Sequence, residues 1–288
     1  MKKYILFIIT ACLVVLFIPK TSFAADGTGL GISPVRKSST VDAGVVKTSF
    51  FTIANRTKKP MNVQLSIKQF SGVDYSNDLQ FSPPQNNWVK LKSTSITLQP
   101  NQNEKIYYDI DVPAKSTPGG QYYTFIASSE VAGEGLPSTI QATSLLYLTV
   151  DGKLIRTGVL KNSSVPWFVT GSSIPYKFDI EDLGNVHFSV YTYGRLDSIF
   201  GPLPEVGASH LLMPRVIRTV SGYVPSPFLP GIYQITYGYK VDFADFIVTK
   251  SSLIVYAPPW SFVALLLIIL AAVRFEQQLK KHRNARKN

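Results

Sequence analysis

Apolar and polar residues alternate along several short segments of the chain, most clearly between residues 61 and 68. Every odd position there is apolar and every even position is polar, in the run Met61-Asn62-Val63-Gln64-Leu65-Ser66-Ile67-Lys68. A period of two gives an extended segment one apolar and one wet face. This is typical of a half-buried antiparallel strand, which we predict over 61–70.

Similar segments recur through the first half of the chain. The further strands predicted there are 45–54, 88–91, 95–98, 105–112, 121–128 and 143–150. Turn residues separate them, as in Gln99-Pro100-Asn101 and Thr117-Pro118-Gly119-Gly120. No window of useful length has helical periodicity. Roughly seven strands in about 120 residues predict an immunoglobulin-like β-sandwich over 25–150.

A second β-rich region follows a hinge predicted at Asp151-Gly152-Lys153. The strands predicted in it are 156–161, 176–181, 187–193, 195–198, 216–220, 231–239 and 246–256. We expect residues 151–257 to form a second immunoglobulin-like domain. The predicted fold is thus all-β, with two tandem immunoglobulin-like β-sandwiches followed by one C-terminal transmembrane α-helix.

That helix is predicted over 258–275, where the chain carries no charge until Arg274. Roughly 18 helical residues span about 27 Å, close to the hydrocarbon thickness of a bilayer. Trp260 stands where an interfacial aromatic is expected. A buried core helix is the alternative, and it is disfavoured because such helices are rarely apolar on every face.

The N-terminus has the pattern of a secretory signal peptide over 1–24, with an uncleaved anchor as the alternative. Met1-Lys2-Lys3 precedes an apolar run, and small residues place cleavage before Ala25. The basic tail, 276–288, is expected to stay in the cytoplasm. These segments predict a single-pass cell-membrane protein with an extracellular ectodomain.

The distribution of charge excludes a nucleic-acid partner. Of the net charge of +11, +5 lies on residues 274–288, +3 on the first 24 residues and only +3 on the segment between them. A nearly balanced ectodomain has no broad basic surface for phosphates. The single cysteine, Cys12, lies in the signal segment, which favours a bacterial envelope, and a Gram-positive one, over a disulfide-bonded secreted protein.

The sequence predicts no catalytic residue, cofactor or metal, and therefore no enzyme. The external part has two histidines, His187 and His210, no cluster with metal-ligand spacing, and neither a nucleophile-elbow nor a phosphate-loop motif. A structural hydrogen bond is favoured over catalysis for His187. The acidic group around Asp182 lies beside a turn, where capping or solvation is favoured over a carboxylate pair for sugar hydrolysis.

Several motifs resemble WxL-interacting surface proteins of Gram-positive bacteria. Those that resemble the first domain of that family are Gly31–Arg36, Asp42–Gly44, Thr52–Val63 and Val112–Tyr123. Those that resemble its second domain are Leu183–His187 and Leu212–Pro214 with Arg218. The family combines a signal peptide, two immunoglobulin-like domains, one membrane helix and a short basic tail.

This resemblance implies a non-enzymatic, membrane-anchored adaptor. The first domain would bind peptidoglycan or another cell-wall polymer, and the second a surface or host protein. Under this hypothesis the candidate ligand-binding residues are Gln121, Tyr122 and Tyr123, because amide and phenol groups suit sugar hydroxyls. The alternative for the two aromatics is ordinary packing in the core or on the sheet.

A second function remains open on the residues alone. A strand-built domain can act as a chaperone or assembly factor for surface fibres by donating a strand to an unfolded subunit. Basic residues near the first strand, such as Arg36 and Lys37, would then bind a carboxylate terminus.

Overall fold

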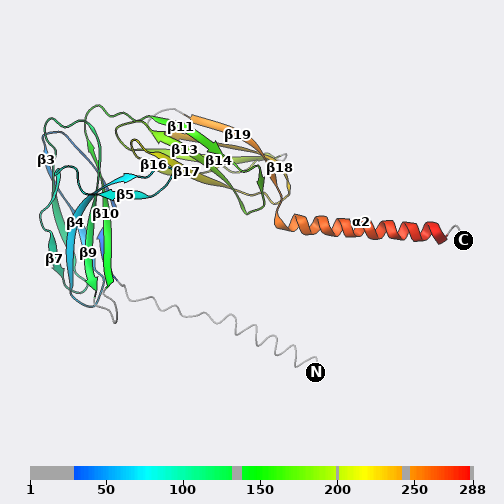
Figure 1. The fold of residues 1–288 in the computed structure, drawn as a ribbon, viewed down its shortest axis with the longest axis horizontal. Coiled ribbons are helices and arrows are strands. Elements are labelled where there is room, and N and C mark those ends of the chain that lie inside the picture. Colours follow the sequence, from blue (N-terminus) through cyan, green and yellow to red (C-terminus); the bar gives the residue numbers. More distant parts are fainter. Residues whose placement is uncertain (1–28, 132–137, 199–200, 242–246, 286–288) are drawn as a thin grey trace, which may run out of the picture.

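The computed structural model describes residues 29–131, 138–198, 201–241 and 247–285. Figure 1 shows two groups of strands in succession and one helix at the C-terminal end. The predicted class, mostly β with one apolar C-terminal helix, is confirmed. We call residues 30–150 the first unit and 158–256 the second unit. The predicted signal peptide lies outside the described residues.

The first unit has two sheets around one apolar core. The smaller sheet has the order β1-β3-β8-β6, formed by Leu30–Ser33, Val46–Asn55, Asn103–Asp111 and Val89–Leu91. The larger has the order β2-β10-β9-β4-β5, formed by Arg36–Val41, Ser138–Val150, Gly119–Val131, Met61–Gly72 and Leu79–Ser82, with β7 (Ser95–Leu98) also paired to β4. Inward-facing side chains such as Phe51, Tyr108 and Phe125 are fully buried between them. The core therefore lies between the two sheets.

The second unit repeats this plan around a separate core. Its smaller sheet has the order β11-β13-β17, formed by Gly158–Ser164, Ser173–Asp182 and Ile217–Pro225. Its larger sheet has the order β12-β19-β18-β14-β15, formed by Phe168–Val169, Ile247–Tyr256, Gly231–Val241, Phe188–Ser198 and Gly201–Pro202, with β16 (Val206–Leu212) also paired to β14. Tyr176, Phe178 and Tyr239 fill the centre.

In both units the chain begins in the smaller sheet and then crosses to the larger one. β1 pairs antiparallel with β3, after which β2 runs parallel to the last strand, β10, from Arg36 opposite Leu145 to Val41 opposite Val150. β11 pairs antiparallel with β13, and β12 runs parallel to β19 with Phe168 opposite Val255. In each unit, therefore, the first strand lies in the smaller sheet and the second strand pairs with the last strand of the larger sheet.

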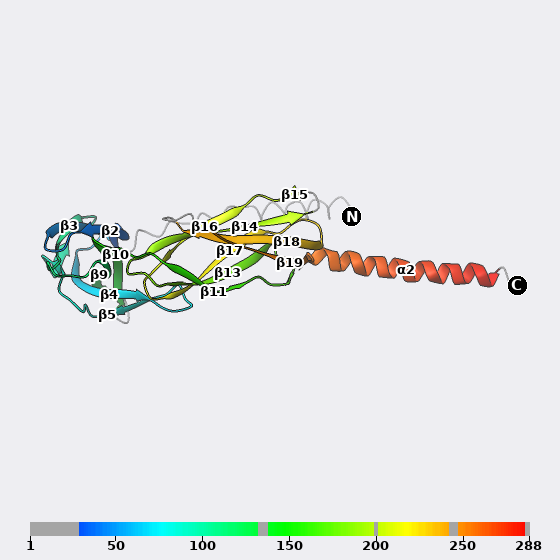
Figure 2. The ribbon, with the colours of Figure 1, turned by 90° about the horizontal axis from the view of Figure 1, so that it is seen from above.

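The two units contact each other through a third apolar cluster. Phe70 and Tyr147 of the first unit are buried against Met213 of the second. Backbone hydrogen bonds also cross the contact: Tyr75 N–H donates to the Ile217 carbonyl (2.6 Å). Figure 2 shows the two units adjoining in a second view. The contact combines apolar burial with hydrogen bonds that fix its geometry.

Most predicted strands are confirmed, but two boundaries are wrong for physical reasons. The segments predicted at 187–193 and 195–198 form one strand, β14. Gly194 interrupts the pattern, yet it is needed because a Cβ there would lie 2.6 Å from the Tyr176 ring. The last strand of the first unit begins at Ser138 rather than 143, since only two apolar residues, Ile140 and Ala142, mark its first half and both are only half-buried.

The C-terminal helix, α2, runs from Pro259 to Ala285. Its stretch Pro259–Leu279 is long and apolar enough to cross a membrane by length and composition, and none of it is buried against the rest of the protein. The helix continues ten residues past residue 275, the predicted end of the membrane span. Glu, Gln, Leu and Lys residues follow Phe275, and these continue a helix readily.

Candidate binding site at the β9–β10 hairpin

The hairpin of β9 and β10 is longer than the strands on either side of it. β9 and β10 pair from Gly119 opposite Val150 to Val131 opposite Ser138. β4 pairs with β9 only as far as Gln64 opposite Ser128, and β2 pairs with β10 only from Leu145 onward. We call Ser129–Val131 and Ser138–Ser144 the distal hairpin. No strand of the described chain pairs with its outer edges.

The open edge of β10 presents unpaired backbone groups. Leu145 N–H donates to the Val35 carbonyl (2.8 Å), so the groups of Leu145 point toward the edge occupied by β2. Backbone groups of successive strand residues point to alternate edges, so those of Thr139, Gln141 and Thr143 point the same way. The side chains of these three residues are exposed. This half of β10 thus offers an edge for a further strand.

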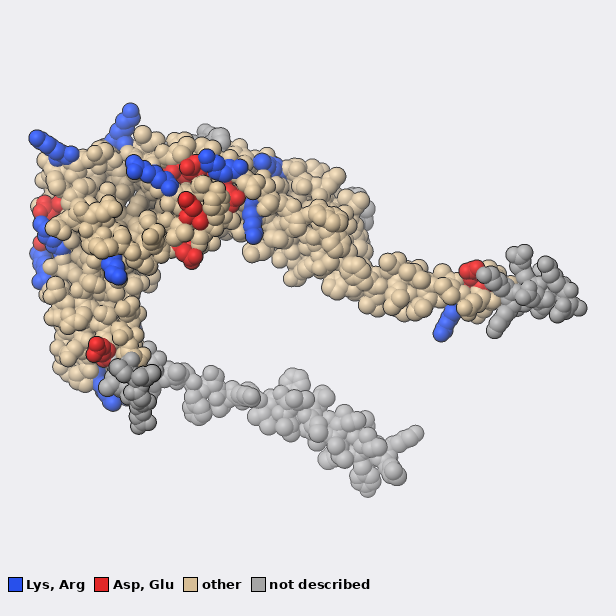
Figure 3. Space-filling view, in the orientation of Figure 1, with Lys and Arg blue, Asp and Glu red and all other residues tan. Residues whose placement is uncertain are grey.

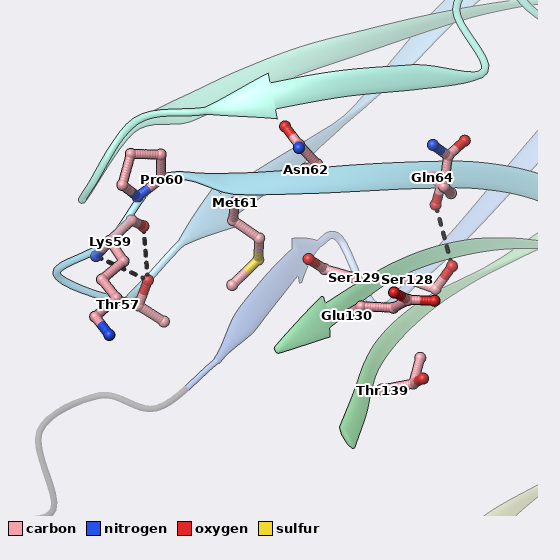
Figure 4. A pocket seen from close by; sticks show the side chains of 10 residues that line it. All are labelled: Thr57, Lys59, Pro60, Met61, Asn62, Gln64, Ser128, Ser129, Glu130 and Thr139. Atoms are coloured by element: carbon pink, nitrogen blue, oxygen red, sulfur yellow. Dashed lines mark hydrogen bonds between the residues drawn. The ribbon is translucent and has the colours of Figure 1, made fainter. Parts of the chain in front are cut away.

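A pocket lies along the other outer edge, where β4 and β9 diverge (Figure 4). Its volume is about 670 Å³. Its polar lining comes from both strands and from the start of β10: Asn62, Gln64, Ser128, Glu130 and Thr139. Divergence of two adjacent strands exposes edge groups that a regular sheet would pair. The pocket is therefore a slot between strands with polar side chains along its walls.

A buried hydroxyl lies at this slot. Ser129 lines the pocket and is 3% exposed, and its Oγ has no hydrogen-bond partner among the described residues. Leaving such a group unsatisfied costs about 1–3 kcal/mol. Met61, which is buried, supplies an apolar surface beside it. The Ser129 hydroxyl and the Met61 thioether thus add to the polar side chains that line the slot.

Asn55 fixes the turn that forms one wall of the slot. Its side chain is 1% exposed, and Nδ2 donates to the carbonyls of Lys59 (2.8 Å), Leu98 (3.2 Å) and Gln99 (3.1 Å). Its Oδ1 accepts from Thr57 N–H (2.9 Å). An Asn at a strand end before a proline-containing turn is the sequence signal for this role.

The predicted ligand-binding residues lie in the other half of the hairpin. Tyr123 is fully buried, its hydroxyl donates to Asn86 Oδ1 (2.5 Å), and burial raises its pKa to about 12. Tyr122 lies in the contact between the units, where burial raises the pKa of its hydroxyl. Gln121 is half-buried. The geometry gives both tyrosines packing roles, and a ligand-binding role for the three residues stays a prediction.

The two external histidines also make hydrogen-bonding contacts within the fold. His187 Nδ1 lies 3.2 Å from the Tyr122 hydroxyl, which accepts the His187 backbone N–H (3.0 Å). Desolvation, followed by the nearby Arg156 and Arg36, lowers the pKa of His187 to about 4. His210 Nε2 lies 3.2 Å from Thr192 Oγ1. The predicted structural hydrogen bond of His187 is confirmed.

Asp182 is a capping residue, as predicted, but it is not solvated. It is fully buried, and its Oδ1 accepts the Gly184 N–H (2.7 Å). Burial raises the pKa of its carboxyl to about 6, and the Gly184 hydrogen bond opposes this shift. Within the described ranges, no group of three or more His, Cys, Asp and Glu side chains is placed to hold a metal ion.

Arg36 and Lys37 do not converge on one site. The Arg36 guanidinium lies over the Tyr147 ring, 5.2 Å from its centroid, whereas Lys37 Nζ donates to Ser49 Oγ (2.6 Å) and to the Phe50 carbonyl (3.2 Å). Neighbouring residues of a strand point to opposite faces, so the structure separates the two cations. The described contacts therefore do not bring the two cations together at one carboxylate site.

Comparison with known proteins places fimbrial chaperones among the similar solved structures. No family model matches the chain, and no curated protein sequence is similar to it. The chaperone CfaA of class 5 fimbriae is 11% identical, with a TM-score of 0.45 over 80% of this chain and 100% of that one. The CsuC–CsuE complex of Acinetobacter baumannii, a chaperone with a tip adhesion subunit, is 12% identical, with a TM-score of 0.37 over 67% and 90%. The SafB chaperone structure with the SafA pilin of Salmonella enterica is 14% identical, with a TM-score of 0.37 over 78% and 96%.

These comparisons overturn the predicted function of a cell-wall adaptor. The three structures are of fimbrial or pilus chaperones, and none of them is of a cell-wall adaptor. Identities between 11% and 14% and TM-scores below 0.5 limit this similarity to the fold.

Proposed function

We propose that this chain is an assembly factor that binds an extended segment of another surface protein along the distal hairpin. One observation carries the proposal: β10 between Ser138 and Ser144 is paired on one edge only, although the strands that pair with the rest of the hairpin are in place. An open edge is a template for another strand. The alternative function predicted from the sequence is thus the one we propose.

The side chains beside this edge fit the binding of a strand. Ile140 and Ala142 pack against the core of the first unit, while the residues between them are exposed. A segment laid along the edge would hydrogen-bond to the backbone of Thr139, Gln141 and Thr143. Its alternate side chains would cover Ile140 and Ala142, so its own sequence would need alternating apolar residues.

We propose the following fold and membrane topology for the protein that carries this site. Each unit is an immunoglobulin-like sandwich, and the protein is non-enzymatic. α2 is a single membrane anchor, with both units outside the cell and the C-terminus in the cytoplasm. The helix composition supports this anchor, since Pro259–Leu279 is apolar and exposed. Membership of the WxL-interacting family stays a prediction that no comparison tests.

A backbone substitution at the open edge tests the proposal. In Gln141→Pro, an N–H that points away from β9 is lost, so the hairpin keeps its own hydrogen bonds while the edge is blocked. Gln141→Ala is the matched control, because it removes only the side chain. A photoreactive benzoylphenylalanine at Thr139 in each full-length chain, irradiated in living cells, reports the partner as a discrete crosslinked band.

We expect the band with the parent chain and with Gln141→Ala, and at least a tenfold weaker band with Gln141→Pro, as expected for a loss of about 1.4 kcal/mol or more in binding. Melting temperatures of the purified chains verify that all three fold. An undiminished band with Gln141→Pro, or no band with any chain, would contradict strand addition at this edge. The same label at exposed Tyr107 on β8 gives the background.

A further inference from the structure

The end of the second unit next to α2 exposes large apolar side chains from three separate segments. Trp167 is 74% exposed, Phe228 79% and Ile232 71%. The stretches 162–176, 226–239 and 251–273, which meet at this end, contain no charged residue. On the face shown in Figure 3, Lys, Arg, Asp and Glu gather over the first unit and the adjoining part of the second, and the end beside α2 has none. We call these exposed residues the apolar end.

Part of the apolar end is a row of side chains across three neighbouring strands. Phe168 on β12 stands opposite Val255 on β19, which stands opposite Ile232 on β18. Leu253, two residues before Val255, extends this face of β19 and is 68% exposed. The ring of Trp167 lies 5.5 Å from that of Phe168. A sheet face of this composition is normally covered.

The remaining part is the loop between β17 and β18, which is held in place by hydrogen bonds. Ser226 Oγ donates to the Gly171 carbonyl (2.8 Å), and the Tyr233 hydroxyl donates to the Leu229 carbonyl (2.8 Å). Phe228 at the loop tip stacks on Trp260 of α2, with ring centroids 5.5 Å apart and planes at 27°. The apolar end is therefore continuous with the first turn of the helix.

We propose that the apolar end inserts into the outer interface of the lipid bilayer around α2. This inference rests on the proposed membrane anchor and is independent of strand binding at the distal hairpin. Only Ala257 and Pro258 separate β19 from α2, so this end cannot stand away from a bilayer that α2 spans. Figures 1 and 2 show α2 leaving the second unit at this end.

The chemistry of the surface favours lipid over a protein as its occupant. Tryptophan and phenylalanine with no nearby charge are typical of the headgroup–acyl boundary. A protein partner that covered this end would have to fit between the second unit and the membrane. In this arrangement the rings of Trp167, Phe168 and Phe228 would lie in the same interfacial layer as Trp260.

Tryptophan fluorescence in lipid tests this inference on the full-length chain. The chain has three tryptophans, Trp88, Trp167 and Trp260, so two Trp→Phe substitutions leave each one alone in turn. Each single-tryptophan chain is placed in nanodiscs of phosphatidylcholine with or without bromine at acyl carbons 6 and 7. Bromine near the interface quenches a tryptophan that lies within contact distance of it.

We expect the brominated lipid to quench Trp260 and Trp167 to a similar extent and to leave Trp88, in the first unit, unchanged. Quenching of Trp260 without Trp167 would overturn insertion of the apolar end while keeping the anchor. No quenching of either would overturn the anchor as well. Strand binding is measured separately, so its failure would not be confused with either outcome.

A matched pair of charge substitutions on one strand gives a second readout. Leu253 and Ile247 lie on the same face of β19, and both are exposed, but Ile247 is about 20 Å further from the helix at 3.3 Å per residue. In the chain whose only tryptophan is Trp167, we expect Leu253→Asp to reduce quenching and Ile247→Asp to leave it unchanged. Equal quenching in both variants would count against contact between the sheet face and lipid.

Discussion

The two units share one strand plan and differ in the edges and faces that they leave open. In the first unit, β2 covers Leu145–Val150 of the last strand and leaves a polar half with free backbone groups. In the second, β12 covers only Val255 and Tyr256, and the exposed face beside it is apolar. Two units with the same strand plan can therefore present surfaces that suit different binding partners. Free hydrogen-bonding groups suit a polypeptide, and an uncharged apolar face suits lipid.

Matched core truncations give the sharpest test of whether the two units are independent. Phe125 and Phe178 are both buried and lie among other aromatic rings, so alanine at either should cost about 3–5 kcal/mol. We expect calorimetry of the full chain in detergent to show that each substitution lowers the melting of its own unit. A single transition shifted equally by both variants would show that the units unfold together.

The second unit should depend on pH through Asp182, because its pKa is about 6 in the folded protein and its usual value is 3.8. The folded state then binds a proton that the unfolded state does not, so the free energy of unfolding falls as pH rises from 4 to 6. The size is about 1–3 kcal/mol. Asp182→Asn should lack this contribution, so the stability of the variant relative to the parent chain should rise between pH 4 and 6, which urea titrations of both chains at pH 4, 5 and 6 measure.

His187 acts in the opposite direction. Its pKa is about 4 in the folded protein and 6.5 ordinarily, so the unfolded state takes up the proton first and stability falls as pH drops from 6.5 to 4. We expect His187→Gln to become relatively more stable than the parent chain on acidification, again by about 1–3 kcal/mol. The two contributions nearly cancel in the parent chain. A parent and His187→Gln chain with the same pH profile would contradict the desolvated histidine.

The smallest expected effect concerns the hydroxyl that joins the units. Tyr122→Phe leaves the ring in the apolar cluster but removes the acceptor of the His187 N–H, at a cost of about 1 kcal/mol. We expect this change to reduce the coupling between the melting of the two units. Tyr107→Phe, on the exposed face of β8, serves as the control. An unchanged melting profile would assign the coupling to the apolar cluster alone.

The sequence predicts those parts of the fold that local alternation encodes. The strand at Met61–Gly72 alternates clearly and was predicted almost to its ends. β2 and β12 were not predicted as strands, because each is short and pairs in parallel with a strand far along the chain. β16 was missed because Gly207 and Ala208 interrupt its apolar pattern.

The candidate sites were harder to predict because they arise where distant strands meet or part. The slot exists because β4 and β9 stop pairing at Gln64 and Ser128, and no local pattern marks that point. Tyr122 is predicted to bind a ligand because a phenol suits sugar hydroxyls, and its contact with His187 has no local signal because the two residues lie 65 positions apart. The apolar end was also missed, although the lack of charge around Trp167, Phe228 and Leu253 is visible in the sequence.

The parallel pairing in each unit also sets the order in which the protein can be completed. A chain that emerges from its N-terminus presents Arg36–Val41 long before Leu145–Val150, so β2 has no partner until the first unit is almost fully synthesised. β12 likewise waits for Val255 and Tyr256, which directly precede α2. The last strand pairing of the second unit therefore becomes available only as the helix itself emerges. The second unit can therefore complete its strand pairing only when the chain just before α2 has been synthesised.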